Sequence, residues 1–289
     1  MSDASSSLLL FAGSGPAGGP SRAEAGAGEG GRGAGGAVAR GEAAFRLERA
    51  DAIELLGGLP SDSVDLVVTD PAYESLEKHR AIGTTTRLKH SSSSSNDWFA
   101  IFPNARFPEL FAEAYRVLRR NTHLYVFCDQ ETMFVAKPIA EKVGFKFWKG
   151  IVWDKARIGM GYHYRSRHEM ILFFEKGKRK LNDLSVPDVL RFPRVHRGYP
   201  SEKPPEVSEV LVRQSSQPGE LVVDPFCGSG SVGVAALRQG RRFLGGDVSA
   251  AAVQVASERL AAASAAGHAV DAERTAVDAA DGERVSGEP

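Results

Sequence analysis

The sequence predicts an α/β protein built on a doubly wound, mostly parallel sheet of seven strands. Segments of strand composition alternate with segments of helical periodicity between residues 44 and 264. DLVV (65–68) and ELVV (220–223) each run through consecutive apolar residues, which is typical of strands that helices cover on both faces. In such a sheet, ligands bind at the carboxyl ends of the strands.

The expected elements follow one another in chain order. AFRLER (44–49) and SVDLVVT (63–69) predict the first two strands, and PELFAEAYRVLR (108–119) predicts a helix before the strand THLYVFC (122–128). A second helix, TMFVAKPIAEKV (132–143), precedes the strands FWKGIVWD (147–154) and EMILFFE (169–175). The remaining elements are the helix 204–214, the strand 219–224, the helix 231–239, the strand 241–247 and the helix 251–261.

Composition bounds the class of protein. The 289 residues are 42% hydrophobic and 25% charged, enough to build one large domain with a substantial core. The 36 basic and 36 acidic residues balance, but residues 141–200 carry 14 Lys and Arg against 6 Asp and Glu. A basic middle beside an acidic end suits a face that binds a polyanion, although a solvated charged surface explains the charge equally well.

Both ends and one internal segment depart from the alternating pattern. Residues 1–43 hold 12 of the 31 glycines, and we expect this tail to be disordered; residues 265–289 predict a flexible acidic tail. Residues 74–97 carry a five-serine run without periodicity, which predicts a mobile basic loop. With two cysteines, no apolar run of membrane-spanning length and no signal sequence, we expect a cytoplasmic protein that does not enter a membrane.

The glycine-rich segment DPFCGSGSVG (224–233) ends one strand and opens the next helix. Gly228, Gly230 and Gly233 satisfy the dinucleotide fingerprint, and Asp247 follows at the distance expected for a ribose-binding acid. The segment DPFC (224–227) stands between the strand and the first glycine, where a dinucleotide fold usually turns at once. An acid at this point instead suits a cofactor that has an amino group and no pyrophosphate. S-adenosylmethionine is such a cofactor, while a dinucleotide or a purely structural turn stays open.

Two motifs together carry a family resemblance. DPAY (70–73) near the front and DPFCGSG (224–230) near the back resemble the catalytic and cofactor motifs of the DNA amino-methyltransferases, in the permuted order of the beta group. The resemblance covers about residues 44–262. It implies a circularly permuted Rossmann-like methyltransferase domain over residues 44–264, with sheet order 3-2-1-4-5-7-6 in the family's numbering and the seventh strand antiparallel.

The resemblance also implies a cofactor, S-adenosylmethionine, and residues that hold it. The turn at Asp224 would embrace the methionine portion, Asp247 the ribose hydroxyls, Asp51 the adenine side, and Lys203 the cofactor carboxylate. The full implied set is Asp51, Asp70, Lys203, Asp224, Phe226, Cys227, Gly228, Gly230 and Asp247.

The chemistry explains why an acid should follow a strand in DPAY. The lone pair of an exocyclic base nitrogen is delocalised into the ring, so acceptors that hold the amino hydrogens favour a more nucleophilic, tetrahedral nitrogen. Asp70 and the carbonyl of Pro71 would be these acceptors, and Tyr73 would stack on a base flipped out of the duplex. Ala72 departs from the family, which more often has a second proline there. The alternative interpretation of DPAY is purely structural: a turn at the end of a strand, with Asp70 as a helix N-cap.

The sequence favours adenine in double-stranded DNA as the substrate, because Asp70 stands where the family's cytosine enzymes often have serine. Cytosine, RNA, a nicotinamide-dependent oxidoreductase and a DNA-binding protein with a decayed site stay open. We expect no metal; a homodimer and a companion restriction endonuclease are further expectations. Basic residues expected to contact DNA are Lys78, Arg80, Arg87, Lys89, Lys178, Arg179, Arg194 and Arg197, with residues 176–202 as a short target-recognition segment.

Overall fold

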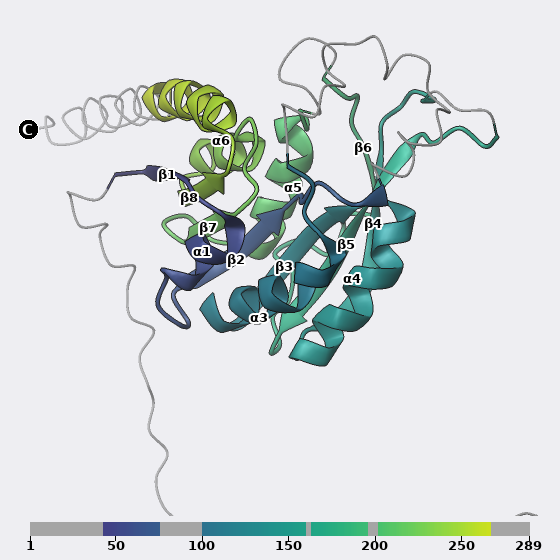
Figure 1. Ribbon diagram of the computed structural model, residues 1–289. Helices are drawn as coiled ribbons and strands as arrows, with labels where there is room; N and C mark the ends of the chain where they lie inside the picture. The colour runs from purple at the N-terminus through teal and green to yellow at the C-terminus, as the bar shows by residue number, and fades with distance from the viewer. Residues whose placement is uncertain (1–42, 76–99, 160–162, 196–201, 267–289) are drawn as a thin grey trace, which may run out of the picture. The chain divides into compact units, whose positions relative to one another are not determined.

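A computed structural model describes residues 43–75, 100–159, 163–195 and 202–266 of the chain (Figure 1). By contacts the chain divides into Met1–Ala39 and Arg40–Pro289, and every described residue belongs to the second unit. The expected disordered tail, most of the 74–97 loop and the acidic tail beyond residue 266 lie outside the described residues.

The core of the fold is one eight-stranded sheet with the order β1-β8-β7-β2-β3-β5-β4-β6 (Figure 1). Strand β5 is antiparallel to both of its neighbours, β3 and β4, and every other pairing is parallel. The strands are β1 (Phe45–Arg49), β2 (Val64–Thr69), β3 (Leu118–Cys128), β4 (Lys146–Asp154), β5 (His168–Lys176), β6 (Val189–Arg191), β7 (Leu221–Asp224) and β8 (Arg242–Asp247).

The expected sheet order is confirmed for seven of these strands, including the antiparallel one. The expectation of seven strands in all is wrong, because β6 adds an eighth at the edge by pairing with β4, Val152 opposite Val189. Strand β6 has only three residues, which is too short for an apolar pattern to be recognised in the sequence.

Helices cover both faces of the sheet and divide the core into two clusters. One face packs against α1 (Ala52–Gly57), α3 (Phe107–Val117) and α4 (Gln130–Val143). The other packs against α5 (Pro205–Ser215), α6 (Ser231–Arg238) and the helix that begins at residue 250 and continues through residue 266. Because β2 has Val67 in the first cluster and Leu66 and Val68 in the second, its unbroken apolar run follows from burial on both sides.

The helices α1 and α3 differ from the sequence expectation in ways that affect the site or the sheet. Helix α1 is an addition to the expected elements; it begins because Asp51 caps it, its carboxylate accepting from the Ile53 N–H at 3.0 Å. Helix α3 ends at Val117 and not at residue 119, because Leu118 turns to extended backbone and opens β3. The strand therefore starts four residues earlier than predicted.

The glycine-rich turn after β7 depends on backbone that other residues adopt poorly. Gly228 has φ of +49° and Gly230 has φ of +78°, in the left-handed region. A Cβ atom on Gly230 would lie 2.7 Å from Leu260 Cδ1, so this glycine also lets α6 start close against the last described helix. Asp224 precedes this turn at the end of β7, and Asp247 ends the adjacent strand β8.

Candidate active site

A cavity of about 270 Å³ lies at the carboxyl edge of the sheet. The last residues of β7 and β8, Asp224 and Asp247, line it, and so does Asp70, which directly follows β2. Since β2, β7 and β8 are consecutive parallel strands, their carboxyl ends bring these three acids to one place. Ten of the expected site residues line the cavity: Asp51, Asp70, Pro71, Tyr73, Lys203, Asp224, Phe226, Cys227, Gly228 and Asp247.

Gly230 is the expected cofactor residue that does not line this cavity. Gly230 is the N-cap residue of α6. It packs closely against Ala256 and Leu260 of the last described helix. Its contribution is therefore to the shape of the turn and to helix packing, not to a contact with a ligand in the cavity.

Asp70 has a partner on each carboxylate oxygen. Oδ1 accepts a hydrogen bond from the Tyr73 hydroxyl at 3.2 Å, and Oδ2 is bound by the Lys203 ammonium. Tyr73 is buried, and burial followed by the charge of Asp70 raises the pKa of its phenol well above the ordinary value. The phenol therefore stays a hydrogen-bond donor that orients Asp70, a role the sequence did not suggest.

Burial disfavours the charged form of the other two acids. Burial raises the pKa of Asp224 to about 8, against one backbone donor, the Phe226 N–H at 3.0 Å. Burial likewise raises the pKa of Asp247, which accepts from the N–H groups of Gly228 at 3.0 Å and Ser249 at 2.8 Å. A cation or hydroxyl donor entering the cavity would stabilise either carboxylate.

Asp51 is tied to a residue that sequence reasoning missed. Arg106 donates to both of its oxygens, at 2.7 and 2.9 Å, and this bidentate pair is the first cause that lowers the pKa of Asp51. The Arg106 guanidinium lies 5.3 Å from the ring centroid of Phe102, which meets Phe226 edge-on at 5.0 Å. Phe102 and Phe226 form an apolar wall of the cavity beside the acids.

Glu169 is the second missed residue, because its place in an alternating strand predicts only an ordinary strand position. It lines the cavity from β5, where Trp153 of β4 lies opposite it. Its Oε1 accepts from Lys155 at 2.5 Å and its Oε2 lies 3.4 Å from the Lys203 ammonium. Only the pairing of β4 with β5 brings Lys155 to Glu169, so spacing along the chain gave no signal.

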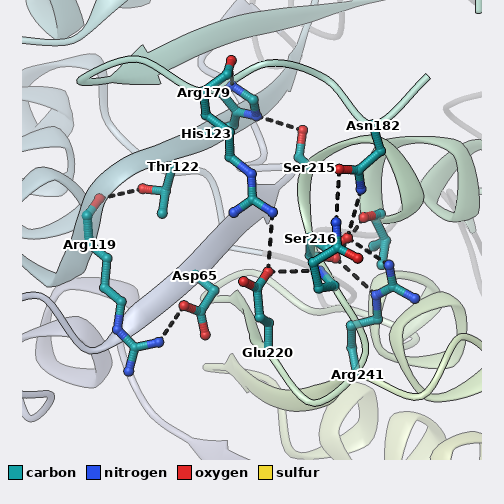
Figure 2. A network of polar contacts seen from close by, with 12 residues as sticks. Asp65, Arg119, Thr122, His123, Arg179, Asn182, Ser215, Ser216, Glu220 and Arg241 are labelled. Carbon is teal, nitrogen blue, oxygen red and sulfur yellow. Dashed lines mark hydrogen bonds and ion pairs between the residues drawn. The ribbon is translucent and has the colours of Figure 1, made fainter. Parts of the chain in front are cut away.

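The structure separates the residues expected to contact DNA. Lys178 and Arg179 follow the carboxyl end of the antiparallel β5, which lies at the opposite edge of the sheet from the cavity. There Arg179 faces Glu220 at 3.4 Å within a polar network (Figure 2). Arg194 is exposed and follows β6 on the cavity side. The others, Lys78, Arg80, Arg87, Lys89 and Arg197, lie outside the described residues.

The fold and the cavity define a Rossmann-like α/β domain that binds its ligand at the carboxyl edge of the sheet, as methyltransferases do. The model of the DNA methylase family N6_N4_Mtase matches residues 64–258, so the chain belongs to that family. The dinucleotide interpretation of the glycine-rich turn is thereby set aside.

Relatives of the chain carry related activities. It is 27% identical over 243 residues to the type II methyltransferase M.HpaI of Haemophilus parainfluenzae, a match that covers 74% of each chain. It is 27% identical over 264 residues to the DNA adenine methyltransferase YhdJ of Escherichia coli, 78% of this chain and 85% of YhdJ.

Solved structures show the same fold. TTHA0409 of Thermus thermophilus matches 76% of this chain and 95% of its own, with a TM-score of 0.57 at 25% identity, and it has also been solved in complex with S-adenosyl-L-methionine. The cytosine-N4-specific PvuII DNA methyltransferase matches 74% of this chain and 86% of its own, with a TM-score of 0.59. At 17% identity, the second likeness concerns the fold alone.

Proposed function

We propose that the chain transfers a methyl group from S-adenosylmethionine to the exocyclic N6 amino group of adenine in double-stranded DNA. The observation that carries this proposal is the position of Asp70, an acid placed by the end of β2 on the same cavity as Asp224 and Asp247. One acid can hold the amino group that accepts the methyl, while the other two face the remainder of the same space.

The residues present fit S-adenosylmethionine. Asp247 offers carboxylate oxygens for ribose hydroxyls, and the buried Asp224 offers a carboxyl group that an α-ammonium group would hold in its ionised form. Ser208 lines the cavity, and its buried hydroxyl has no hydrogen-bond partner among the described residues. A bound ligand could supply that partner. When bound, the cofactor supplies the methyl group on a sulfonium.

The protein's own groups would act on the amino nitrogen. Asp70 accepts a hydrogen bond from the amino group and so favours the tetrahedral nitrogen that attacks the methyl carbon. The proton that the methylated nitrogen must then lose leaves along this hydrogen bond. Tyr73 fixes the carboxylate through its hydroxyl at 3.2 Å, and the positive charge that develops on the nitrogen lies beside an anion. Stacking of the base on Tyr73 stays a prediction; its ring is buried in this structure but borders the cavity.

Adenine is favoured over cytosine by Asp70 and by the likeness to the adenine methyltransferase YhdJ. The test is mass spectrometry of nucleosides from unmethylated plasmid DNA incubated with the protein and S-adenosylmethionine. N6-methyldeoxyadenosine is the expected product. N4-methyldeoxycytidine would keep the reaction and change the base, while no methylated base on DNA that the protein binds would overturn the proposal.

Partners and location stay predictions. Among the residues that the structure describes, no helix combines the length and apolarity needed to cross a bilayer. We expect the protein to act on double-stranded DNA in the cytoplasm. Size-exclusion chromatography with light scattering would test the expected homodimer, and a pull-down would test a companion restriction endonuclease.

A further inference from the structure

Glu169 is held in a way that a simple structural ion pair does not require. Lys155 fixes its Oε1 at 2.5 Å, while Oε2 is shielded from solvent and has no hydrogen bond to any described residue. The nearest cation to Oε2 is the Lys203 ammonium at 3.4 Å. A buried acceptor oxygen whose one cation stands at 3.4 Å is incompletely satisfied, so Oε2 can take a closer donor.

Lys203 is shared unequally between two acids. Its ammonium is bound to Asp70 Oδ2 and stands off from Glu169 Oε2, with the Phe127 ring centroid 5.4 Å away. Burial acts to lower the pKa of Lys203, but the charges of Asp70 and Glu169 raise it above its ordinary value. Lys203 therefore stays a cation whichever acid it contacts.

Glu169 also keeps its charge. Burial acts to raise its pKa, but the ammonium groups of Lys203 and Lys155 hold it below the ordinary value. Three side chains that line the cavity, Asp70, Lys203 and Glu169, and Lys155 behind Glu169 alternate in charge. We call these four residues the carboxyl-edge cluster.

Methyl transfer makes the observed contact of Lys203 unfavourable. An ammonium on Asp70 Oδ2 occupies an acceptor that a target amino group needs, and it draws charge from the carboxylate. As the methyl group arrives, positive charge builds on the amino nitrogen, and a neighbouring ammonium opposes it. The ammonium must therefore leave Asp70 before the reaction.

We propose that Glu169 is a positioning residue for this transfer, receiving the Lys203 ammonium when the target amino group takes its place on Asp70. The proposal rests on the proposed function. The move is short, because Oε2 is already 3.4 Å away and Lys155 keeps the Glu169 carboxylate in place. An ammonium has three donors, so Lys203 on Glu169 can still donate to a cofactor carboxylate nearby.

The test compares Glu169→Gln with wild type in single-turnover methylation of DNA at saturating S-adenosylmethionine. Glutamine keeps the shape but lacks the charge that attracts the ammonium. We expect the rate of transfer to fall about 10–100-fold, while the affinity for S-adenosylhomocysteine, measured by calorimetry, stays close to that of wild type. The melting temperature should fall, because Lys155 and Lys203 lose the carboxylate they share, so rates are compared per folded molecule. Glu209→Gln is the matched control, since Glu209 pairs with Arg238 on the surface of α5, away from the cavity, and its rate should be unchanged.

A double-variant cycle separates positioning from structure. In a Lys203→Met background there is no ammonium to receive, so adding Glu169→Gln should cost at most about threefold in rate. A merely structural Glu169 would give the same loss in both backgrounds. Glu169→Asp, which keeps the charge on a shorter stem, should recover part of the rate lost in Glu169→Gln.

The outcomes divide cleanly. If wild type forms no methylated base on DNA that it binds, both this inference and the proposed function are overturned. If wild type is active and Glu169→Gln transfers within about twofold of its rate, or loses equally in both backgrounds, the inference alone is overturned.

Discussion

The two edges of the sheet carry polar clusters of opposite character. At the amino edge, His123 is fully buried and its two ring nitrogens lie 2.8 Å from Ser215 Oγ and 3.3 Å from the Arg179 carbonyl oxygen (Figure 2). Arg241 holds Ser216 through two hydrogen bonds, at 3.0 and 2.7 Å. We call the set His123, Tyr125, Arg179, Ser215, Ser216, Glu220 and Arg241 the amino-edge network.

At the carboxyl edge, the polar groups are less completely matched. One lysine serves two acids, Glu169 Oε2 lacks a hydrogen bond among the described residues, and burial keeps Asp224 protonated below about pH 8. Each member of the amino-edge network, by contrast, has a partner within the protein. The difference indicates that one edge fastens the fold, and the other keeps interactions open for ligands.

The largest expected effect is that of Asp70→Ala. Removing the acceptor of the amino hydrogens should lower single-turnover methylation by at least about 10²-fold. Binding of S-adenosylhomocysteine should change little, because Asp224 and Asp247 remain. Calorimetry and nucleoside mass spectrometry on the same preparation measure the two effects, and near wild-type turnover would remove Asp70 from the chemistry.

Asp224 should make the cofactor-free protein less stable as the pH rises. Its pKa is raised from 3.8 to about 8 in the folded protein, so between these values the folded state binds the extra proton. The stabilisation is fully present below pH 3.8 and is lost as the pH rises to 8, at up to about 1.4 kcal/mol per pH unit.

Asp224→Asn should remove that pH dependence and raise the melting temperature of the cofactor-free protein above that of wild type at about pH 8. It should also weaken S-adenosylhomocysteine binding, since the anion that meets the amino group is gone. Thermal unfolding over a pH series on both sides of that value makes the comparison; parallel curves for the two proteins would contradict it.

Ser215→Ala tests the amino-edge network. The change leaves His123 Nδ1 and the Tyr125 hydroxyl without the partner they share at 2.8 and 2.7 Å, and an unsatisfied buried group costs about 1–3 kcal/mol. The free energy of unfolding, from urea titration, should fall by that amount. Methyl transfer per folded molecule should be unchanged, and a selective loss of transfer would show that the two edges are coupled.

The smallest effects concern DNA affinity. Arg194→Gln, on the cavity side, should weaken binding and reduce the slope of log affinity against log salt by about 1. Lys178→Gln, at the opposite edge, should leave both quantities unchanged. Fluorescence anisotropy over a salt series measures them; equal effects of the two variants would show that DNA reaches the amino edge.

The sequence predicted seven of the eight strands because their apolar patterns are clear; β6 was missed. DLVV and ELVV are apolar on both faces, and their burial against two helical layers matches that pattern. The acids of the site were also predictable, since Asp70, Asp224 and Asp247 each follow or end such a strand.

The contacts that the sequence could not predict join residues that lie far apart along the chain. Arg106 reaches Asp51 across 55 residues, and Lys203 reaches Asp70 across 133. Lys155 and Glu169 meet only because β4 and β5 pair in one register. The same reason explains why the prediction for Arg179 differs from its position. Its charge suggested a DNA contact, but the antiparallel direction of β5 places it at the amino edge, where it faces Glu220.

The most direct test of the contrast between the edges is methyl transfer per folded molecule, with wild type, Asp70→Ala and Ser215→Ala assayed together on one DNA at a temperature where all three are folded. The account predicts that Asp70→Ala alone loses transfer, while Ser215→Ala matches wild type despite its lower stability. If Asp70→Ala keeps its activity, or if both variants lose it alike, the carboxyl-edge cluster is not the site of the chemistry.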